Sequence, residues 1–190
     1  MKKVIVIGFL FVLVSAFALQ TTWVNDDAHS QVQFTVVHLG ISDVSGFFRD
    51  FDASITAEKE DFSDAVFTFS AKTASIDTRV EMRDNHLKSV DFFDVEKYPT
   101  MEFKSTSITS KGNNLYELKG NLTLLGTSKP VTLELQYRGT ILNSQSNKQT
   151  AGFSARGTID RRDFNLGSGF PPPMISNEVR IKVDGEFTKN

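Results

Sequence analysis

Apolar and polar residues alternate with a period of two along most of the chain. Near the C-terminus, Val179, Ile181 and Val183 share one face, and Arg180 and Lys182 occupy the other. Successive side chains of a β-strand point to opposite faces, so this alternation is typical of a strand with one buried side. The same pattern predicts eight strands, at residues 30–38, 45–55, 64–71, 100–109, 115–125, 130–139, 150–160 and 178–187.

Short polar segments join these predicted strands. Residues 111–114 and 126–130 carry the Gly, Asn, Ser and Pro typical of hairpin turns, and residues 143–147 form a polar loop. Strands joined in this way run antiparallel, so the predicted fold class is all-β. Eight antiparallel strands can close into a barrel, which either fills with its own side chains or holds one small ligand. A two-sheet sandwich has the same periodicity and is the structural alternative.

One stretch, residues 82–99, breaks the alternation with the sequence MRDNHLKSVDFFDVEKYP. Apolar residues recur at helical spacing within residues 78–88, which predicts a short helix. A helix of this length is marginal alone and needs a surface to pack on, which an open barrel end provides. Val90, Phe92 and Phe93 would then cover that end, so we expect the helical excursion to form a lid.

The first 18 residues have the parts of a secretory signal peptide. A positively charged start precedes an apolar run at residues 4–14, and Ala16 and Ala18 supply the small residues of a cleavage site. The run is shorter than the ~20 apolar residues of a spanning helix, which disfavours a retained membrane anchor. We therefore predict a signal peptide at 1–18, a single domain at 19–190 with no integral membrane span after cleavage, and a periplasmic or secreted location.

Composition excludes several classes of protein. Cleavage removes Lys2 and Lys3 and no acidic residue, so the formal net charge falls from −2 to −4. A mildly acidic chain without a basic run argues against nucleic-acid binding. The chain has no Cys, which excludes disulfides, thiol catalysis and Cys-ligated zinc. The fold must therefore rest on buried apolar surface alone.

Four blocks in order along the chain resemble one protein family. They are DAHSQVQFTVVHLGISDVSGFFRDF at 27–51, TRVEMRDNHLKSVDFFDVEKYPTMEF at 78–103, GNLTLLGTSKPV at 120–131 and IDRRDFN at 159–165. Together they resemble the YceI-like family of exported, lipocalin-like barrels associated with polyisoprenoid binding. The family commonly has Gly where Asn165 stands. Because Asn tolerates positive φ better than most residues, we expect the tight turn to be kept.

The resemblance implies an eight-stranded antiparallel lipocalin-like barrel that binds a polyisoprenoid or a fatty amphiphile in an elongated apolar pocket, without a cofactor and without catalysis. The mature chain keeps 14 of 17 phenylalanines, which add contact area and no polar atom. The alternative is that they fill a dry core. The inward strand faces predict nine ligand-lining residues: Phe34, Val36, Phe67, Phe69, Phe103, Leu122, Leu124, Leu133 and Phe153.

The excursion and the fourth block supply polar and lid candidates. Arginine pairs well with phosphate, so these residues are expected to form a lid or to meet a lipid head group. Adjacent Arg83 and Asp84 are expected to diverge around the helix axis, which disfavours a catalytic cluster. The alternative function is a hydrolase or isomerase in which His86 acts as general base. The lid or head-group candidates are Arg83, Asp84, His86, Phe92, Phe93 and Arg161.

The three histidines do not predict a metal site. His29 and His38 lie at opposite ends of one predicted strand, and no HxH or HExxH spacing occurs. We expect His29 to cap a strand start through local hydrogen bonds, and we expect no bound metal. An unpaired strand edge or an exposed Phe48 would support a homodimer.

Overall fold

The computed structural model describes residues 20–190; the predicted signal peptide lies outside this range. The described chain forms eleven strands in one sheet, one α-helix and three short 3₁₀ segments. The strands are β1 (Thr21–Asn25), β2 (Gln31–His38), β3 (Ser42–Phe48), β4 (Phe51–Ala57), β5 (Val66–Lys72), β6 (Ile76–Asp77), β7 (Thr100–Gly112), β8 (Leu115–Leu124), β9 (Thr127–Asn143), β10 (Lys148–Asp160) and β11 (Glu178–Lys189). The helices are α1 (Glu81–Lys88), η1 (Asp27–His29), η2 (Thr73–Ser75) and η3 (Arg161–Phe164).

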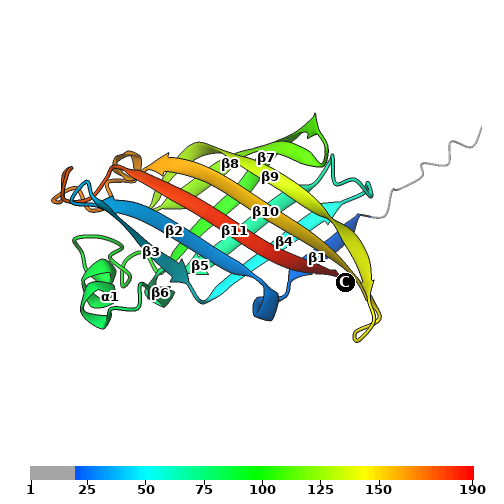
Figure 1. Ribbon diagram of the computed structural model, residues 1–190, viewed down its shortest axis with the longest axis horizontal. Helices are drawn as coiled ribbons and strands as arrows, with labels where there is room; N and C mark the ends of the chain where they lie inside the picture. The colour runs from blue at the N-terminus through cyan, green and yellow to red at the C-terminus, as the bar shows by residue number, and fades with distance from the viewer. Residues whose placement is uncertain (1–19) are drawn as a thin grey trace, which may run out of the picture.

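The sheet closes on itself as an antiparallel barrel (Figure 1). The ring runs β1-β4-β5-β7-β8-β9-β10-β11, and β11 pairs with β1 to complete it. Beyond a bend, β2 continues the position of β1, because β2 also pairs with β11. In the same way β3 continues the position of β4, and it pairs with β2. The ring therefore has eight strand positions, which confirms the predicted all-β eight-stranded barrel and makes the sandwich alternative wrong.

The predicted strand at 45–55 is in fact two strands, broken at Arg49 and Asp50. Phe48 turns inward and is only 5% exposed. The Arg49 guanidinium lies 4.7 Å from the centre of the Phe47 ring, which faces outward. A period of two over residues 45–55 would place Phe47 inward with Phe51 and Ile55 and would expose Phe48, and the structure reverses both. Phe48 therefore offers no exposed surface for a homodimer. Period-two counting fails at such a break because the bend changes which residues face the interior.

The hairpin turns follow the chemistry of positive φ angles. Asn113 and Asn114 have φ of 52° and 59°, as a tight type I′ turn requires. The second predicted turn is shorter than residues 126–130: it consists of Leu125 and Gly126, and Pro130 already pairs within the β8–β9 ladder. Asn165 adopts φ of 58°, which confirms the tight turn expected there.

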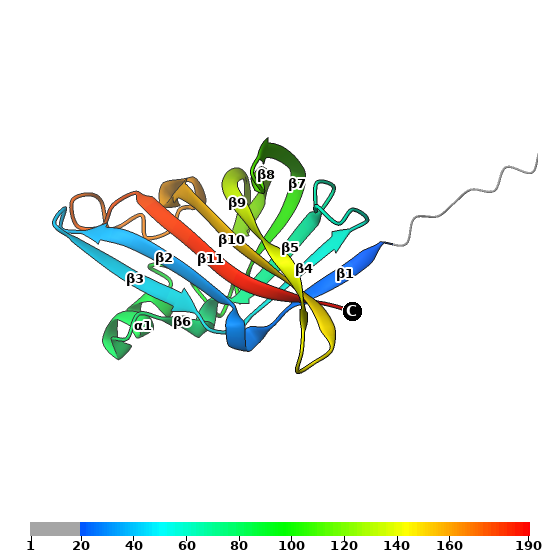
Figure 2. The same ribbon diagram turned by 45° about the vertical axis from the view of Figure 1, so that its right-hand side comes forward.

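The two ends of the barrel differ. Helix α1, β6 and the β2–β3 turn gather at one end, and β1, the C-terminus and the β9–β10 hairpin lie at the other (Figures 1 and 2). The helix begins at Glu81, three residues later than predicted, and ends at Lys88 as predicted. Strand β7 starts at Thr100, directly after the Tyr98–Pro99 pair that was expected to end the excursion.

Candidate binding cavity

A cavity of about 440 Å³ lies inside the barrel and reaches the α1 end. This volume falls within the range typical of small-molecule sites. Thirty-eight residues line it, ten of them phenylalanines and only seven with polar or charged side chains. The interior is therefore partly hollow, and its wall is suited to an apolar guest rather than to a polar one.

All nine residues predicted to contact a ligand line this cavity. They come from six strands, β2, β5, β7, β8, β9 and β10, so the cavity wall extends around much of the barrel. The period-two pattern thus identified the inward faces of these six strands correctly. It missed the contribution of the loop after η3, because Leu166, Phe170, Met174 and Ile175 follow no periodic pattern and also line the cavity.

Aromatic side chains close the barrel at the end opposite α1. Phe62, in the loop between β4 and β5, is 2% exposed and packs with its ring centre 5.3 Å from Trp23 and 5.0 Å from Phe153. The Tyr116 hydroxyl donates to the carbonyl of Asp61 at 2.5 Å and fixes this loop. Burial raises the pKa of that hydroxyl, which therefore stays protonated and able to donate. Phe62 was not found from the sequence because it lies in a turn with positive φ.

The cavity opens at the α1 end. Only three of its described lining residues are exposed, His38, His86 and Met174, and all three belong to this end. The β2–β3 turn is joined to the loop after η3 by a hydrogen bond from the Leu39 N–H to the Met174 carbonyl (3.2 Å). That loop meets α1 where the His86 and Phe170 rings lie 5.3 Å apart. These three segments frame the mouth of the cavity.

Arg83 and Asp84 converge on one residue, Thr78, which is 3% exposed. Arg83 donates from Nε to the Thr78 hydroxyl and from Nη2 to its carbonyl, both at 2.8 Å. The Asp84 carboxylate accepts from the Thr78 N–H at 2.8 Å and from its hydroxyl at 2.5 Å. The expectation that the two side chains diverge is wrong, because helical side chains lean back toward the N-terminus and both reach the residue before the helix. Together they tie α1 to the barrel.

Of this pair, only Arg83 lines the cavity. Its Nη1 group makes no hydrogen bond to any residue between 20 and 190 and its Nη2 group makes one, so three of the five N–H donors of this side chain remain available. His86 also lines the mouth, and its Nε2 lies 3.2 Å from the Asp91 carboxylate. Phe92 and Phe93 are buried in the cavity wall next to the helix. Val90, which was expected to cover the barrel end with them, is instead 80% exposed, so that part of the expectation is wrong.

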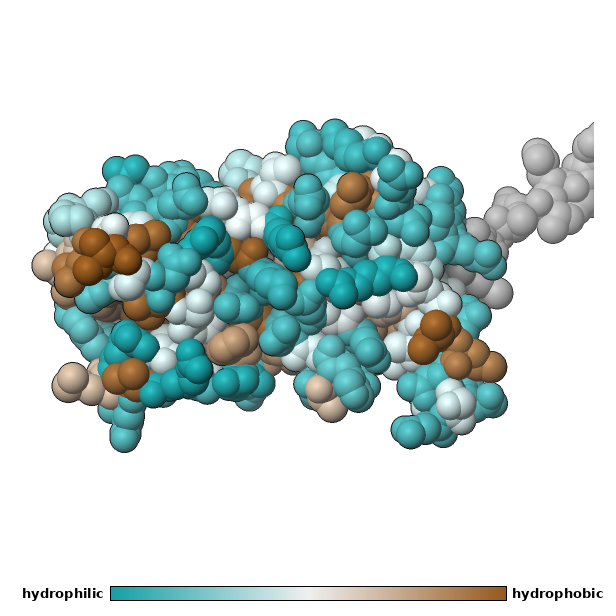
Figure 3. Space-filling model, viewed as in Figure 1, coloured by the Kyte–Doolittle hydropathy of each residue, from teal (hydrophilic) through white to brown (hydrophobic). Residues whose placement is uncertain are grey.

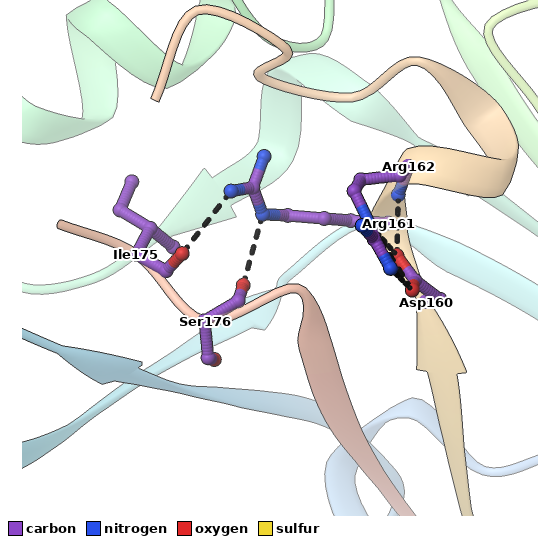
Figure 4. A network of polar contacts seen from close by, with 5 residues as sticks. All are labelled: Asp160, Arg161, Arg162, Ile175 and Ser176. Carbon is purple, nitrogen blue, oxygen red and sulfur yellow. Dashed lines mark hydrogen bonds and ion pairs between the residues drawn. The ribbon is translucent and has the colours of Figure 1, made fainter. Parts of the chain in front are cut away.

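Arg161 lies in the cavity wall but is fully occupied by the protein itself (Figure 4). It is 3% exposed, and burial lowers the pKa of its guanidinium. All five of its side-chain N–H donors point to backbone carbonyls of the loop after η3, so none remains for a ligand head group. The acceptors are Ser176 (2.9 Å), Leu166 (2.8 Å), Gly167 (2.6 Å), Ile175 (3.1 Å) and Phe170.

Arg162 differs from its neighbour. Figure 4 shows it folded back on Asp160, away from the Arg161 guanidinium. Its Nη2 lies 2.6 Å from the Asp160 carboxylate, and the pair is largely exposed to solvent. The side-chain hydrogen bond from Arg162 holds the pKa of Asp160 below its ordinary value of 3.8.

A group of metal-ligand residue types lies at the bend between β1 and β2. Ligand atoms of Asp26, His29 and Glu186 fall within 4.8 Å of one another. The Asp26 carboxylate already accepts from the Ala28 N–H and contacts His29 Nδ1, each at 2.9 Å, and this contact raises the pKa of His29. His29 thus makes the local hydrogen bond expected of it. The absence of a metal stays a prediction.

Comparison with known proteins shows which family this barrel belongs to. The sequence profile of the YceI-like domain matches residues 23–187. The chain belongs to the YceI-like family. Protein YceI of Salmonella arizonae is 38% identical over 178 residues, which cover 94% of this chain and 92% of that protein. Among residues 20–190, no helix has the length and apolar character needed to cross a membrane.

Solved structures share the barrel. The YceI protein of Campylobacter jejuni superposes with a TM-score of 0.73 at 31% identity and covers 80% of this chain and 89% of its own. BcnA of Burkholderia cenocepacia gives a TM-score of 0.77 at 24% identity, with 85% and 98% covered. A polyisoprenoid binding domain from Saccharophagus degradans gives 0.62 at 13% identity, with 89% and 98% covered. The last two comparisons show the fold alone.

Proposed function

We propose that this YceI-like protein is an exported, non-enzymatic lipid-binding protein. It holds the tail of one long isoprenoid or similar amphiphile inside the barrel and so carries or sequesters it. The observation that supports this most is the cavity of about 440 Å³, which is walled by ten phenylalanines and reaches the α1 end of the barrel. The Saccharophagus degradans domain with the same fold is described as polyisoprenoid binding, which agrees with this ligand class.

The chemistry of the wall suits such a tail. An isoprenoid chain forms no hydrogen bonds, so it gains affinity from contact area alone. Burial of apolar ligand surface contributes about 25 cal/mol per Å² before the costs of association are subtracted. The few polar lining groups set the orientation of the ligand in this proposal. Its tail lies toward Phe153, and its polar end lies at the mouth near Arg83 and His86. The available N–H donors of Arg83 favour a head group that accepts hydrogen bonds.

The alternative of an enzyme in the same cavity gains less support. Its candidate base, His86, is exposed and contacts Asp91, which lies outside the cavity wall. Arg83 and Asp84 are engaged with Thr78, so they hold the helix rather than activate a nucleophile.

Organic extraction of the purified protein followed by mass spectrometry tests the proposal. We expect a co-purified amphiphile with a long apolar tail. Ala155 lines the cavity and its strand neighbour Arg156 is exposed on the outer face, so they form a matched pair. Ala155→Trp should fill the cavity and abolish lipid retention, whereas Arg156→Trp should retain lipid as the wild type does. A folded Ala155→Trp protein that carries as much lipid as the wild type would contradict the proposal.

A further inference from the structure

Large apolar side chains are exposed to solvent around the mouth of the cavity. Ile41, Met82 and Val90 are 85%, 82% and 80% exposed. One such residue is ordinary, but several gathered at one place mark an interaction surface. We call the following six residues the mouth rim: Leu39, Ile41, Val80, Met82, Val90 and Met174.

The mouth rim brings together segments that are far apart in the sequence. Leu39 and Ile41 belong to the β2–β3 turn, Met82 to α1, and Met174 to the loop after η3. The turn and that loop are joined by the His38–Ile175 bridge, and the loop reaches the excursion where the Phe92 and Phe170 rings stack at 4.8 Å. Figure 3 shows apolar surface gathered at this end of the molecule.

The rim is continuous with the cavity wall. Met174 belongs to both, since it is 45% exposed and also lines the cavity. His86 and Leu87 of α1 line the cavity, while Met82 of the same helix points to solvent. An apolar surface therefore runs from the interior, through the mouth and onto the outside of the protein.

We propose that the mouth rim inserts into the surface of a lipid bilayer. The ligand then passes between the membrane and the cavity without exposing its tail to water. This inference rests on the proposed lipid-binding function. A bilayer is the occupant that the geometry favours, because the rim surrounds an opening whose interior is as apolar as a lipid tail, and an apolar guest of this kind resides in membranes.

The charges near the rim indicate how the bilayer is recognised. Between residues 79 and 91 the cationic side chains are Arg79, Arg83 and Lys88, and they are balanced by three acidic ones, Glu81, Asp84 and Asp91. A balanced surface gains little from anionic lipids. Docking should therefore depend on apolar insertion, proceed on electrically neutral vesicles and change little with salt.

Vesicle flotation with phosphatidylcholine liposomes tests the inference. The chain offers a matched control, because Ile141 and Leu142 are 66% and 64% exposed at the opposite end of the barrel. Each inserted large aliphatic residue contributes about a tenfold factor to partitioning. The variant Ile41→Ser with Met82→Ser should bind vesicles about 100-fold more weakly than the wild type. The variant Ile141→Ser with Leu142→Ser should bind as the wild type does.

Three outcomes would overturn the inference: no flotation of the wild type, equal loss in both double variants, or flotation that needs anionic lipid and disappears in about 0.5 M salt. Light scattering tests whether a second copy of the protein, rather than a bilayer, covers the mouth rim. A wild-type dimer that the rim variant dissociates, without vesicle binding, also overturns it. Lipid extraction from the same preparations separates the two proposals. A lipid-loaded protein that ignores vesicles contradicts docking alone, whereas an empty protein contradicts the proposed function.

Discussion

Replacement of Arg161 by Met removes the group around which the loop after η3 folds. Five backbone carbonyls lose their donor at once, because all five N–H groups of this buried side chain are engaged. Met has a similar length and no polar atom, so the substitution changes hydrogen bonding more than volume. The loop carries Phe170 and Ile175 into the cavity wall, so its loss affects the site as well as the stability.

The expected loss of stability follows from the number of these hydrogen bonds and from how far water reaches them. A hydrogen bond to a charged group contributes about 1.5–3 kcal/mol, but five such values are not additive. The loop lies at the mouth of the cavity, so water reaches some of the released carbonyls and limits the cost. We expect a loss of about 3–5 kcal/mol in the free energy of unfolding, as for other disrupted buried charge networks. Arg161→Lys keeps three N–H donors, so its free energy of unfolding should fall by less.

Urea denaturation followed by circular dichroism measures this loss, with Arg162→Met as the matched control. Arg162 is the next residue, but its side chain is 62% exposed, and within residues 20–190 its side-chain hydrogen bonds all go to the Asp160 carboxylate. An ion pair that is this exposed to solvent contributes little to stability, so the control should unfold close to the wild type. If Arg161→Met also unfolds within about 1 kcal/mol of the wild type, the assigned role of the guanidinium is wrong.

Two further predictions concern the cavity wall and pH. A Cβ at Gly46 would lie 2.5 Å from the Phe34 ring, so Gly46→Ala should displace this ring and lower lipid retention in the extraction assay; Gly152→Ala, whose Cβ has ordinary contacts, should not. The hydrogen bond from Arg162 lowers the pKa of Asp160 below 3.8, so its small stabilising effect is full above that pH and is lost as the pH falls through the folded-state pKa. Unfolding titrations should therefore show a constant difference between the Arg162→Met and wild-type proteins well above pH 3.8, and the two proteins should converge as the pH falls below that value; a difference that persists unchanged to the lowest pH would contradict the assignment.

The regular part of this protein was predictable because strands impose a period of two. The eight strand positions and the inward face of each strand except the one at 45–55 were expected, and the nine predicted lining residues all reach the cavity. The irregular part was not predictable, since its conformation depends on tertiary contacts. No feature of the neighbouring sequence indicates that Phe62 closes one end of the barrel. Nothing local shows that Arg161, which the sequence presents as a head-group candidate, instead meets five carbonyls of its own loop.

The two bends that the period-two pattern missed decide where the barrel is hollow. On one side of the bends, β1 contributes no residue to the cavity and β4 contributes only Ala53. Ile55 of β4 is instead fully buried, and Trp23 of β1 packs against the Phe62 plug. On the other side of the bends, β2 and β3 supply seven lining residues, among them Phe34 and Phe48. The solid half supplies the tightly packed core on which stability depends, since interiors without voids are the most stable. The hollow half is thereby free to keep an apolar space next to the mouth.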